Sequence, residues 1–304
     1  MTSNLSRRDF IKNSSCIVAG LGLADLQSLR PDGGFSFAMI ADCQYMDSAS
    51  KFTRFYRESK AKLSNCVADL NKHPELKFTI HLGDFIDTGW KSYDELLPVY
   101  DKLKMKSFQL LGNHDFEVSD EQKLLVPKKL GLENRYYQFK QKNCRFIVLD
   151  GNDLGYAAWP KDHPRYKETV KLFKEKNWVG ASWNGAIGQK QMQWLDKQLI
   201  EAGKQKENVI IFCHFPVLDG PMHNLWNAKE VVALLKKHNC VKAYINGHNH
   251  VGDYHKVDGI HYLTVPGMIE TKYRTAYAIV KVTDKALYID GIGRCPDYGL
   301  AFRS

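Results

Sequence analysis

The sequence predicts an α/β protein in which two β-sheets are flanked by helices. Short apolar runs rich in Val, Ile and Phe alternate with segments of helical periodicity along most of the chain, which is typical of buried strands in βαβ units. Several of these runs end in Asp, Asn or His, and the C-terminal part is rich in strands with no helix between them. We therefore expect a helix-covered sheet, a second sheet built from the C-terminal strands, and a polar site at the strand ends.

The individual elements follow one another closely. Strands are expected within 35–42, 77–84, 107–115, 144–150, 208–216, 241–250, 259–267, 276–283 and 285–293. Helices are expected around 53–72, 92–105, 119–130, 189–202 and 228–238. No repeat, low-complexity tract or linker divides residues 31–304, so we assign them to one domain.

The composition is that of an ordinary globular protein. The chain has 304 residues, of which 44% are hydrophobic and 25% are charged, and it has no run of about 18 apolar residues that would span a membrane. The net charge of +9 is either a generally basic surface or a field that attracts anionic substrates such as phosphates. Because the lysines are scattered and do not interleave with aromatic residues, we do not expect a nucleic-acid partner. The oligomeric state stays open.

The N-terminus resembles a twin-arginine export signal. The stretch SRRDFIK contains Arg7 and Arg8 and precedes a short, mildly apolar segment, and Ala24 suits cleavage. The alternative is a basic helix that remains part of the protein. We expect residues 1–24 to be an export signal and the protein to be periplasmic or secreted, whereas the alternative implies a cytoplasmic protein.

The cysteines indicate neither a zinc site nor a disulfide framework. They occur at positions 16, 43, 66, 144, 213, 240 and 295. Their spacing contains no CxxC pair, and those after the signal lie mostly in apolar runs, so we expect small buried hydrophobic residues. An oxidising compartment would permit a disulfide, but the sequence identifies no pair.

Five strand-like runs end in candidate metal ligands. The segments are IADCQ, HLGDFID, LLGNHD, IFCHF and INGHNH. Ligand sites in α/β sheets lie just outside the carboxyl ends of the strands, so these five ends should converge. Each cluster alone is explained by a helix cap, a turn or a buried histidine. The five together, with glycines 83, 112 and 247 to permit sharp turns, predict a metal site.

In this order, the clusters resemble the motifs of the calcineurin-like metallophosphoesterase superfamily. The resemblance implies a catalytic domain over residues 31–304, built as a two-sheet sandwich between helices with a dinuclear site. It also implies that Asp42 and His250 hold one divalent cation and that Asp84 bridges two. The ligands of the second cation would be Asn113, His214 and His248. Such a mixed oxygen and nitrogen set suits Mn²⁺, Fe or Zn²⁺.

The same resemblance implies the catalytic roles. Two metals would activate water and stabilise an in-line displacement at phosphorus. His114 would protonate the leaving oxygen, with Asp87 orienting its ring. Asp115 is expected to be structural or to support the ligands from behind.

Gln44 stands where the superfamily usually has a histidine. An amide oxygen is a harder ligand than imidazole and favours Mn²⁺. Alternatively, Gln44 only hydrogen-bonds a water on the metal, or the site lacks one ligand.

Further stretches resemble a narrower family, the manganese-dependent ADP-ribose/CDP-alcohol diphosphatases. The stretches are ADCQY, TRFYRES, SWNGAIGQKQMQWL, VPGMIET and GIGRCPD. This resemblance covers nearly all of residues 36–298 and implies two Mn²⁺ ions and a small anionic nucleotide substrate. The sequence departs from the animal members in its export-like N-terminus and in a shorter loop after Tyr45, which leaves the substrate open.

Three residues are candidates for nucleotide contact. Trp183 could stack on a base or anchor a loop, and Asn184 could hydrogen-bond the edge of the base. Glu270 could contact ribose hydroxyls or be structural.

The expected reaction is hydrolysis of the pyrophosphate bond of ADP-ribose, CDP-alcohols or similar nucleoside diphosphate conjugates. An alternative is a phosphomonoesterase or cyclic-nucleotide phosphodiesterase on the same scaffold, which would use the same metals and His114. Another alternative is a non-catalytic binding protein, against which the intact ligand set argues.

Overall fold

The computed structural model describes residues 34–303. The predicted export signal at residues 1–24 lies outside the described residues, as do both ends of the predicted 31–304 domain. No helix among the described residues is long and apolar enough to cross a membrane.

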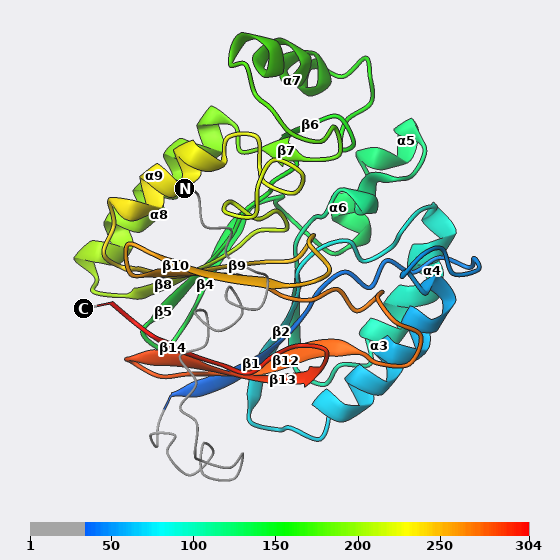
Figure 1. The fold of residues 1–304 in the computed structure, drawn as a ribbon, viewed down its shortest axis with the longest axis horizontal. Helices are drawn as coiled ribbons and strands as arrows, with labels where there is room; N and C mark the ends of the chain where they lie inside the picture. The colour runs from blue at the N-terminus through cyan, green and yellow to red at the C-terminus, as the bar shows by residue number, and fades with distance from the viewer. Residues whose placement is uncertain (1–33, 304) are drawn as a thin grey trace, which may run out of the picture. The chain divides into compact units, whose positions relative to one another are not determined.

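Two large sheets form the centre of the fold (Figure 1). The first contains, in spatial order, β14 (Tyr298–Ala301), β13 (Ala286–Gly293), β12 (Ala276–Val282), β1 (Phe35–Ile40), β2 (Leu76–His81) and β3 (Lys106–Gln109). The second contains β10 (Asp253–Val257), β11 (Ile260–Thr264), β9 (Val241–Asn246), β8 (Asn208–Phe212), β5 (Cys144–Val148) and β4 (Tyr137–Gln141). The predicted two-sheet class is confirmed.

The C-terminal strands do not form a sheet of their own, so that detail of the prediction is wrong. Strand β12 pairs antiparallel with β1, whereas β11 pairs in parallel with β9. Alternating apolar residues report burial but do not identify a partner strand. The parallel strands β1, β2 and β3 form one group, and β9, β8 and β5 form another. The edge of such a group exposes unpaired backbone groups. Strand β12 covers the edge at β1, and β11 covers the edge at β9.

Helices cover the outer faces of both sheets (Figure 1). Helices α3 (Tyr56–Leu70) and α4 (Trp90–Tyr100) lie on one flank. Helices α8 (Gln189–Lys204) and α9 (Ala228–Lys236) lie on the other. The helix expected at 119–130 is instead two short helices, α5 (Asp120–Lys123) and α6 (Val126–Lys129). Pro127 explains the break, because proline removes a backbone donor and fits only the first turn of a helix.

Aromatic residues fill the space between the sheets. Phe37 stacks on Phe78 with ring centroids 4.7 Å apart, and it meets Phe146 and Phe212 of the second sheet edge to face. The described cysteines are free thiols, and all but Cys240 are buried, as expected for small hydrophobic residues. This core fixes the sheets face to face, which brings their strand ends to one common edge.

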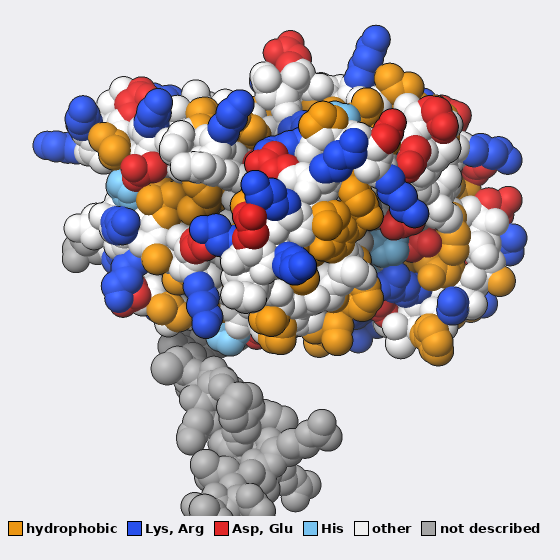
Figure 2. Space-filling view, turned by 90° about the horizontal axis from the view of Figure 1, so that it is seen from above, with side chains coloured by type: hydrophobic (Ala, Val, Ile, Leu, Met, Phe, Trp, Pro, Cys, Tyr) orange, Lys and Arg blue, Asp and Glu red, His pale blue; other side chains and the backbone are white. Residues whose placement is uncertain are grey.

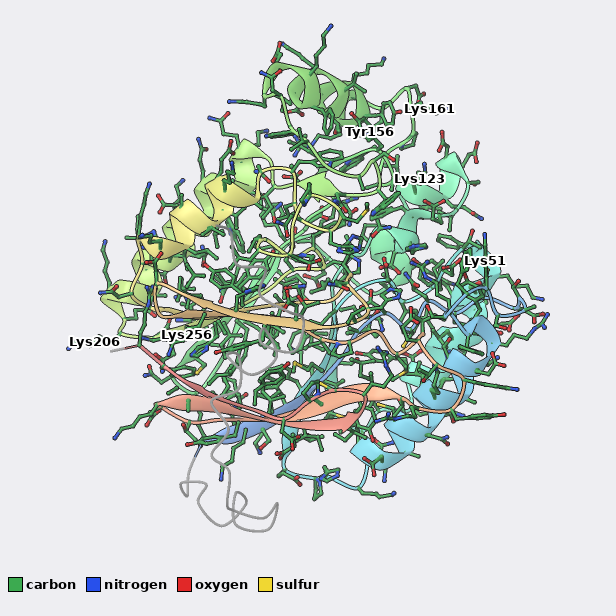
Figure 3. All side chains as sticks on the ribbon, in the orientation of Figure 1. Lys51, Lys123, Tyr156, Lys161, Lys206 and Lys256 are labelled. Atoms are coloured by element: carbon green, nitrogen blue, oxygen red, sulfur yellow. The ribbon has the colours of Figure 1, made fainter. Side chains whose placement is uncertain are left out.

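A small lobe lies beside that edge. It contains α7 (Pro164–Glu175), which was not predicted because its only buried residue is Thr169, and a two-stranded sheet of β6 (Leu154–Gly155) and β7 (Gly185–Ala186). Tyr156 lies under α7 (Figure 3), and its ring meets those of Phe173 and Trp226. This packing holds the chain that precedes β7 next to the site.

The molecular surface carries mixed charge. On the face that Figure 2 shows, Lys and Arg side chains are interspersed with Asp and Glu. That face therefore has no continuous basic band.

Candidate active site

Tight backbone turns at the strand ends aim the candidate ligands inward. Asp42 and Gln44 after β1, and Asp84 after β2, have φ of 52°, 40° and 53°, and His248 after β9 has φ of 69°. A left-handed backbone is uncommon for residues other than glycine and costs about 1–3 kcal/mol, so it persists only where the surroundings enforce it. At these positions it turns each side chain into the same space.

Two glycines allow the turns to approach one another. A Cβ atom on Gly112 would lie 2.1 Å from Asp84 Oδ1. Gly83 has φ of +86°, and a Cβ there would lie 2.7 Å from His214 Nδ1. Neither position has room for a side chain, so the glycines of the motifs are required by the close packing of the ligands.

Asp84 lies at the centre of the site. Its Oδ1 accepts a hydrogen bond from the His114 backbone N–H at 2.8 Å, and its Oδ2 accepts one from Gln44 Nε2 at 2.9 Å. Oδ2 is also 3.2 Å from His214 Nε2. Although burial opposes ionisation, His214 and His114 hold the pKa of Asp84 well below its usual range. Asp84 is therefore an anion whose carboxylate contacts two other candidate ligands, Gln44 and His214.

Asp115 holds the backbone around Asp84 in place. Its carboxylate accepts hydrogen bonds from the backbone N–H groups of Asp84, Phe85 and Gly112 at 3.0, 2.9 and 2.8 Å. Those three bonds tie the turn after β2 to the turn after β3. This is the structural role that was expected for Asp115.

Two of the three histidines that are candidate metal ligands, His214 and His248, face each other. His214 donates from Nδ1 to the Leu82 carbonyl oxygen at 2.8 Å, and His248 donates from Nε2 to Asn184 Oδ1 at 3.0 Å. A histidine that donates from one nitrogen presents a lone pair on the other. The remaining nitrogens, His214 Nε2 and His248 Nδ1, are 3.1 Å apart. Together with Asp84, these atoms lie within 4.8 Å of one another.

The environment of these nitrogens favours a positive charge between them. Burial opposes a charge on His214, but the Asp84 carboxylate raises the pKa of His214 to about 9. Burial and the proximity of His214 hold the pKa of His248 well below its usual range. A divalent cation at this place would satisfy all three groups at once.

The third histidine faces Asp42. His250 Nδ1 lies 2.8 Å from Glu270 Oε1 and donates to it, which leaves Nε2 free, 3.6 Å from Asp42 Oδ1. Burial raises the pKa of Asp42 to about 6, even though His250 opposes the shift. The neighbours of this buried carboxylate offset only part of the cost of burying its charge, so a bound cation would be favourable there.

Two buried amide oxygens complete the fit to metal ions. Gln44 Oε1 and Asn113 Oδ1 are buried and have no hydrogen-bond partner among the described residues. An unsatisfied buried acceptor costs about 1–3 kcal/mol, and coordination to a cation would remove that penalty. The residues that could hold two divalent cations are Asp42, Gln44, Asp84, Asn113, His214, His248 and His250.

His114 lies at the edge of this ligand set. It opens a short 3₁₀ helix, His114–Phe116. Its Nδ1 is 3.1 Å from the Asp87 carbonyl oxygen and 3.3 Å from Asp87 Oδ1. The main-chain carbonyl of Asp87 therefore orients the ring, its carboxylate lies close to the same nitrogen without a hydrogen bond, and Nε2 is left for proton exchange in the pocket.

A pocket of about 410 Å³ opens over these groups. Its lining includes Gln44, Asp84, Asn113, His114, His248 and His250, together with Arg54, Glu117, Trp183, Met222 and His223. A larger hollow of about 740 Å³ lies beside β3 and β4, but its lining contains none of the candidate ligands. We therefore place the chemistry in the smaller pocket.

The sequence reasoning missed four pocket residues, Arg54, Glu117, Met222 and His223, and two of these are basic. Arg54 lines the pocket with its Nη1 3.8 Å from Asp87 Oδ1, and His223 lines it from a loop. Arg54 is part of the TRFYRES stretch and could have been selected as a cation in a family-like segment. No sequence signal marks His223. Trp183 lies where it was expected, half exposed at the pocket.

The structure corrects the roles expected for Asn184 and Glu270. Asn184 is buried, its Nδ2 donates to the carbonyl oxygens of Pro221 and Met222, and its Oδ1 accepts from His248. Glu270 binds the ring of His250. Each side chain holds a candidate ligand histidine in place and neither lines the pocket, so the structure gives both a role other than the nucleotide contact that was expected.

Comparison with known proteins agrees with this geometry. Residues 35–252 match the family model described as calcineurin-like phosphoesterase. The chain is 32% identical to the manganese-dependent ADP-ribose/CDP-alcohol diphosphatase of Oryza sativa subsp. japonica, over 88% of this chain and 94% of that protein. It is 28% identical to the Homo sapiens protein of the same name, over 86% and 91% of the two chains.

A solved structure shows the same fold. A dimetal phosphatase from Danio rerio superposes with a TM-score of 0.81 at 24% identity, covering 90% of this chain and all of that one. The chain therefore belongs to the calcineurin-like phosphoesterase family and, within it, to the manganese-dependent ADP-ribose/CDP-alcohol diphosphatases.

Proposed function

We propose that this protein is a hydrolase with two Mn²⁺ ions that cleaves the pyrophosphate bond of ADP-ribose, CDP-alcohols or similar nucleoside diphosphate conjugates. The observation that carries the proposal is the convergence of the ligand set on one pocket, where Gln44 Oε1 and Asn113 Oδ1 stay unsatisfied without a cation. The names of the rice and human relatives supply the substrate class and the metal.

The chain's own residues divide the work in the pocket. Two divalent cations held by these ligands would supply charge that stabilises the phosphoryl oxygens and would activate a water molecule as the nucleophile. His114, oriented by Asp87, gives a proton to the leaving oxygen. Arg54 presents a guanidinium group to the phosphate that is not attacked, since planar donors suit phosphate oxygens. Trp183 offers an aromatic face for the base.

The test is a comparison of substrates with the purified protein and Mn²⁺. ADP-ribose should give AMP and ribose 5-phosphate, and CDP-choline should give CMP and phosphocholine. Cyclic AMP and p-nitrophenyl phosphate should have a much lower kcat/KM. A higher kcat/KM for either of those two would support the phosphodiesterase or phosphomonoesterase alternative, and inactivity on all four would support a binding protein.

We further propose that the protein is exported through the segment at residues 1–24, because Arg7 and Arg8 precede a short apolar stretch. N-terminal sequencing of the protein from its native host should find a mature chain that begins close to residue 25. Changing Arg7 and Arg8 to lysine should keep the protein in the cytoplasm. A full-length cytoplasmic protein would support the alternative of a basic helix.

A further inference from the structure

The connection between β11 and β12 crosses from the second sheet to the first (Figure 1). Its residues 267–271, called the 267–271 segment below, have no regular secondary structure that would satisfy their carbonyl groups. Two cationic side chains bind four of these five carbonyl oxygens, and the fifth, that of Ile269, accepts from the Phe55 backbone N–H. Both cations come from elements that contain no candidate metal ligand.

Lys62 of α3 is the first of these cations. It is buried, and its Nζ donates to the carbonyl oxygens of Met268, Glu270 and Thr271. An ammonium group has three hydrogens to donate, so these three carbonyls satisfy it completely. Thr271 has φ of 61°, an outlier for a β-branched residue, which indicates that the segment is held in a shape it would not adopt alone.

Arg294, just after β13, is the second cation. Its Nη1 donates to the Gly267 carbonyl oxygen and its Nη2 to the His250 carbonyl oxygen, both at 3.0 Å. One guanidinium group thus ties the start of the segment to the main chain of a candidate metal ligand.

The segment contacts His250 and Asp42 at several points. Glu270 accepts from the His250 ring, the Gly267 N–H donates to the His250 carbonyl, and a Cβ on Gly267 would lie 2.9 Å from His250 Cγ. The Ile269 N–H donates to the Asp42 carbonyl oxygen at 2.9 Å. Both ligands assigned to one cation therefore depend on this one segment.

The ligands of the other cation are held by different groups. His214 is fixed by the Leu82 carbonyl and His248 by Asn184. Among the described residues, the hydrogen bonds of the 267–271 segment reach Asp42 and His250 but not Asn113, His214 or His248. The 267–271 segment therefore directly supports the ligands of one cation. The two ligand sets meet where the His248 backbone N–H donates to the Asp42 carboxylate at 3.1 and 3.2 Å.

We propose that Lys62 and Arg294 are positioning residues that set the affinity of one cation only, the one held by Asp42 and His250. They act through the 267–271 segment, whose carbonyl groups they bind. The inference rests on the two-cation site of the proposed function but not on its substrate. The protein should accordingly bind its two cations with affinities that can be changed independently.

Mn²⁺ titration by calorimetry, with electron paramagnetic resonance of the same samples, tests this inference. In Lys62→Met and Arg294→Met, one of the two Mn²⁺ affinities should fall by about 10- to 100-fold, as for other residues that support ligands from behind. The other affinity should stay unchanged. At one Mn²⁺ per chain, the variants should show the spectrum of an isolated ion, and the spin-coupled signal of a pair should require excess Mn²⁺.

Two matched variants serve as controls. Lys60→Met changes a partly exposed lysine on the same helix, which pairs with Glu95 at 3.5 Å. Arg274→Met removes an exposed arginine that donates to the Gly293 carbonyl. Neither residue donates to a carbonyl of the 267–271 segment, so both affinities should stay at the wild-type values.

Other outcomes overturn the inference. The inference is wrong if both affinities fall together, if neither affinity falls, or if the wild-type protein binds a single Mn²⁺. If Lys62→Met does not fold, Arg294→Met provides the same test, because it removes the other cation that binds the 267–271 segment. Because no substrate is used, failure here is distinct from failure of the diphosphatase assay.

Discussion

The two sheets contribute different chemistry to one site. The oxygen-type ligands follow strands of the first sheet, and they are Asp42, Gln44, Asp84 and Asn113. The nitrogen ligands follow strands of the second sheet, and they are His214, His248 and His250. A mixed oxygen and nitrogen site thus arises where the two sheets meet.

The two halves are also held in place by different means. Three residues of the oxygen half have left-handed backbone turns, at Asp42, Gln44 and Asp84, and glycines make room for them. In the nitrogen half, each imidazole donates to an acceptor that fixes its tautomer, namely the Leu82 carbonyl, Asn184 or Glu270. In the oxygen half, the turns and glycines lie next to their ligands in the sequence, although Asp42 is also held by the distant N–H groups of His248 and Ile269. In the nitrogen half, the acceptors that fix the imidazoles all lie elsewhere in the sequence.

Asp84→Ala should have the largest effect, because Asp84 touches both halves of the site through Gln44 and His214. We expect the variant to lose both cations and its activity to fall to the uncatalysed background. Metal analysis after gel filtration measures the number of bound cations, and the rate of ADP-ribose hydrolysis measures the activity. The control is Asp94→Ala, an exposed carboxylate paired with Lys129. Retention of two cations in Asp84→Ala would contradict the bridging role.

The difference between the halves explains what the sequence could predict. The oxygen ligands and their glycines lie together in short motifs, so GDFID and GNHD could be identified from neighbouring residues alone. The supports of the nitrogen half lie far away in the chain. Asn184 is 64 residues from His248, and Glu270 is 20 residues from His250. From the sequence alone, Asn184 and Glu270 were therefore interpreted as substrate contacts, because each lies in a stretch that resembles the narrower family.

The fold was predictable to a similar extent. Apolar strands followed by helices predicted the layers, because burial leaves a periodic pattern in the sequence. The pairing of β12 with β1, and the helix α7 with its mostly exposed side chains, could not be predicted in this way. Strand pairing depends on which edge remains open after the other strands assemble, and that information is not local.

His114→Ala should have the second largest effect, since His114 stands beside both halves and belongs to neither. We expect the variant to keep both cations and to lose activity on ADP-ribose by about 10²–10⁴-fold, the range for a missing general acid. The loss should be smaller for p-nitrophenyl phosphate than for phenyl phosphate, because p-nitrophenolate is a much weaker base than phenolate and leaves without a proton. Steady-state kinetics with the three substrates measures this. An equal loss on the two phenyl esters would remove His114 from the acid role.

Asn184→Ala tests the nitrogen half directly. His248 would lose the acceptor that fixes its tautomer, so the affinity for the cation held by His214 and His248 should fall by about 10- to 100-fold. The other cation should bind as before, which is the opposite result to that expected for Lys62→Met. Asn184→Asp keeps an acceptor for His248 and should lose less affinity. Mn²⁺ titration of the two variants provides the measurement.

Gln44→His should have the smallest effect on the amount of activity, and it tests whether the oxygen character of the first half matters. Gln44 donates from Nε2 to Asp84 and points an unpartnered Oε1 into the buried site. An imidazole at this position would replace a hard oxygen ligand by nitrogen, which favours softer metals over Mn²⁺. We expect two cations still to bind, with activity in Zn²⁺ or Co²⁺ rising relative to Mn²⁺. Activity ratios across Mn²⁺, Mg²⁺, Zn²⁺ and Co²⁺ measure the change. If the ratios stay those of the wild type, Gln44 holds Asp84 in place but does not tune the metal, and the preference for Mn²⁺ must come from the other oxygen ligands.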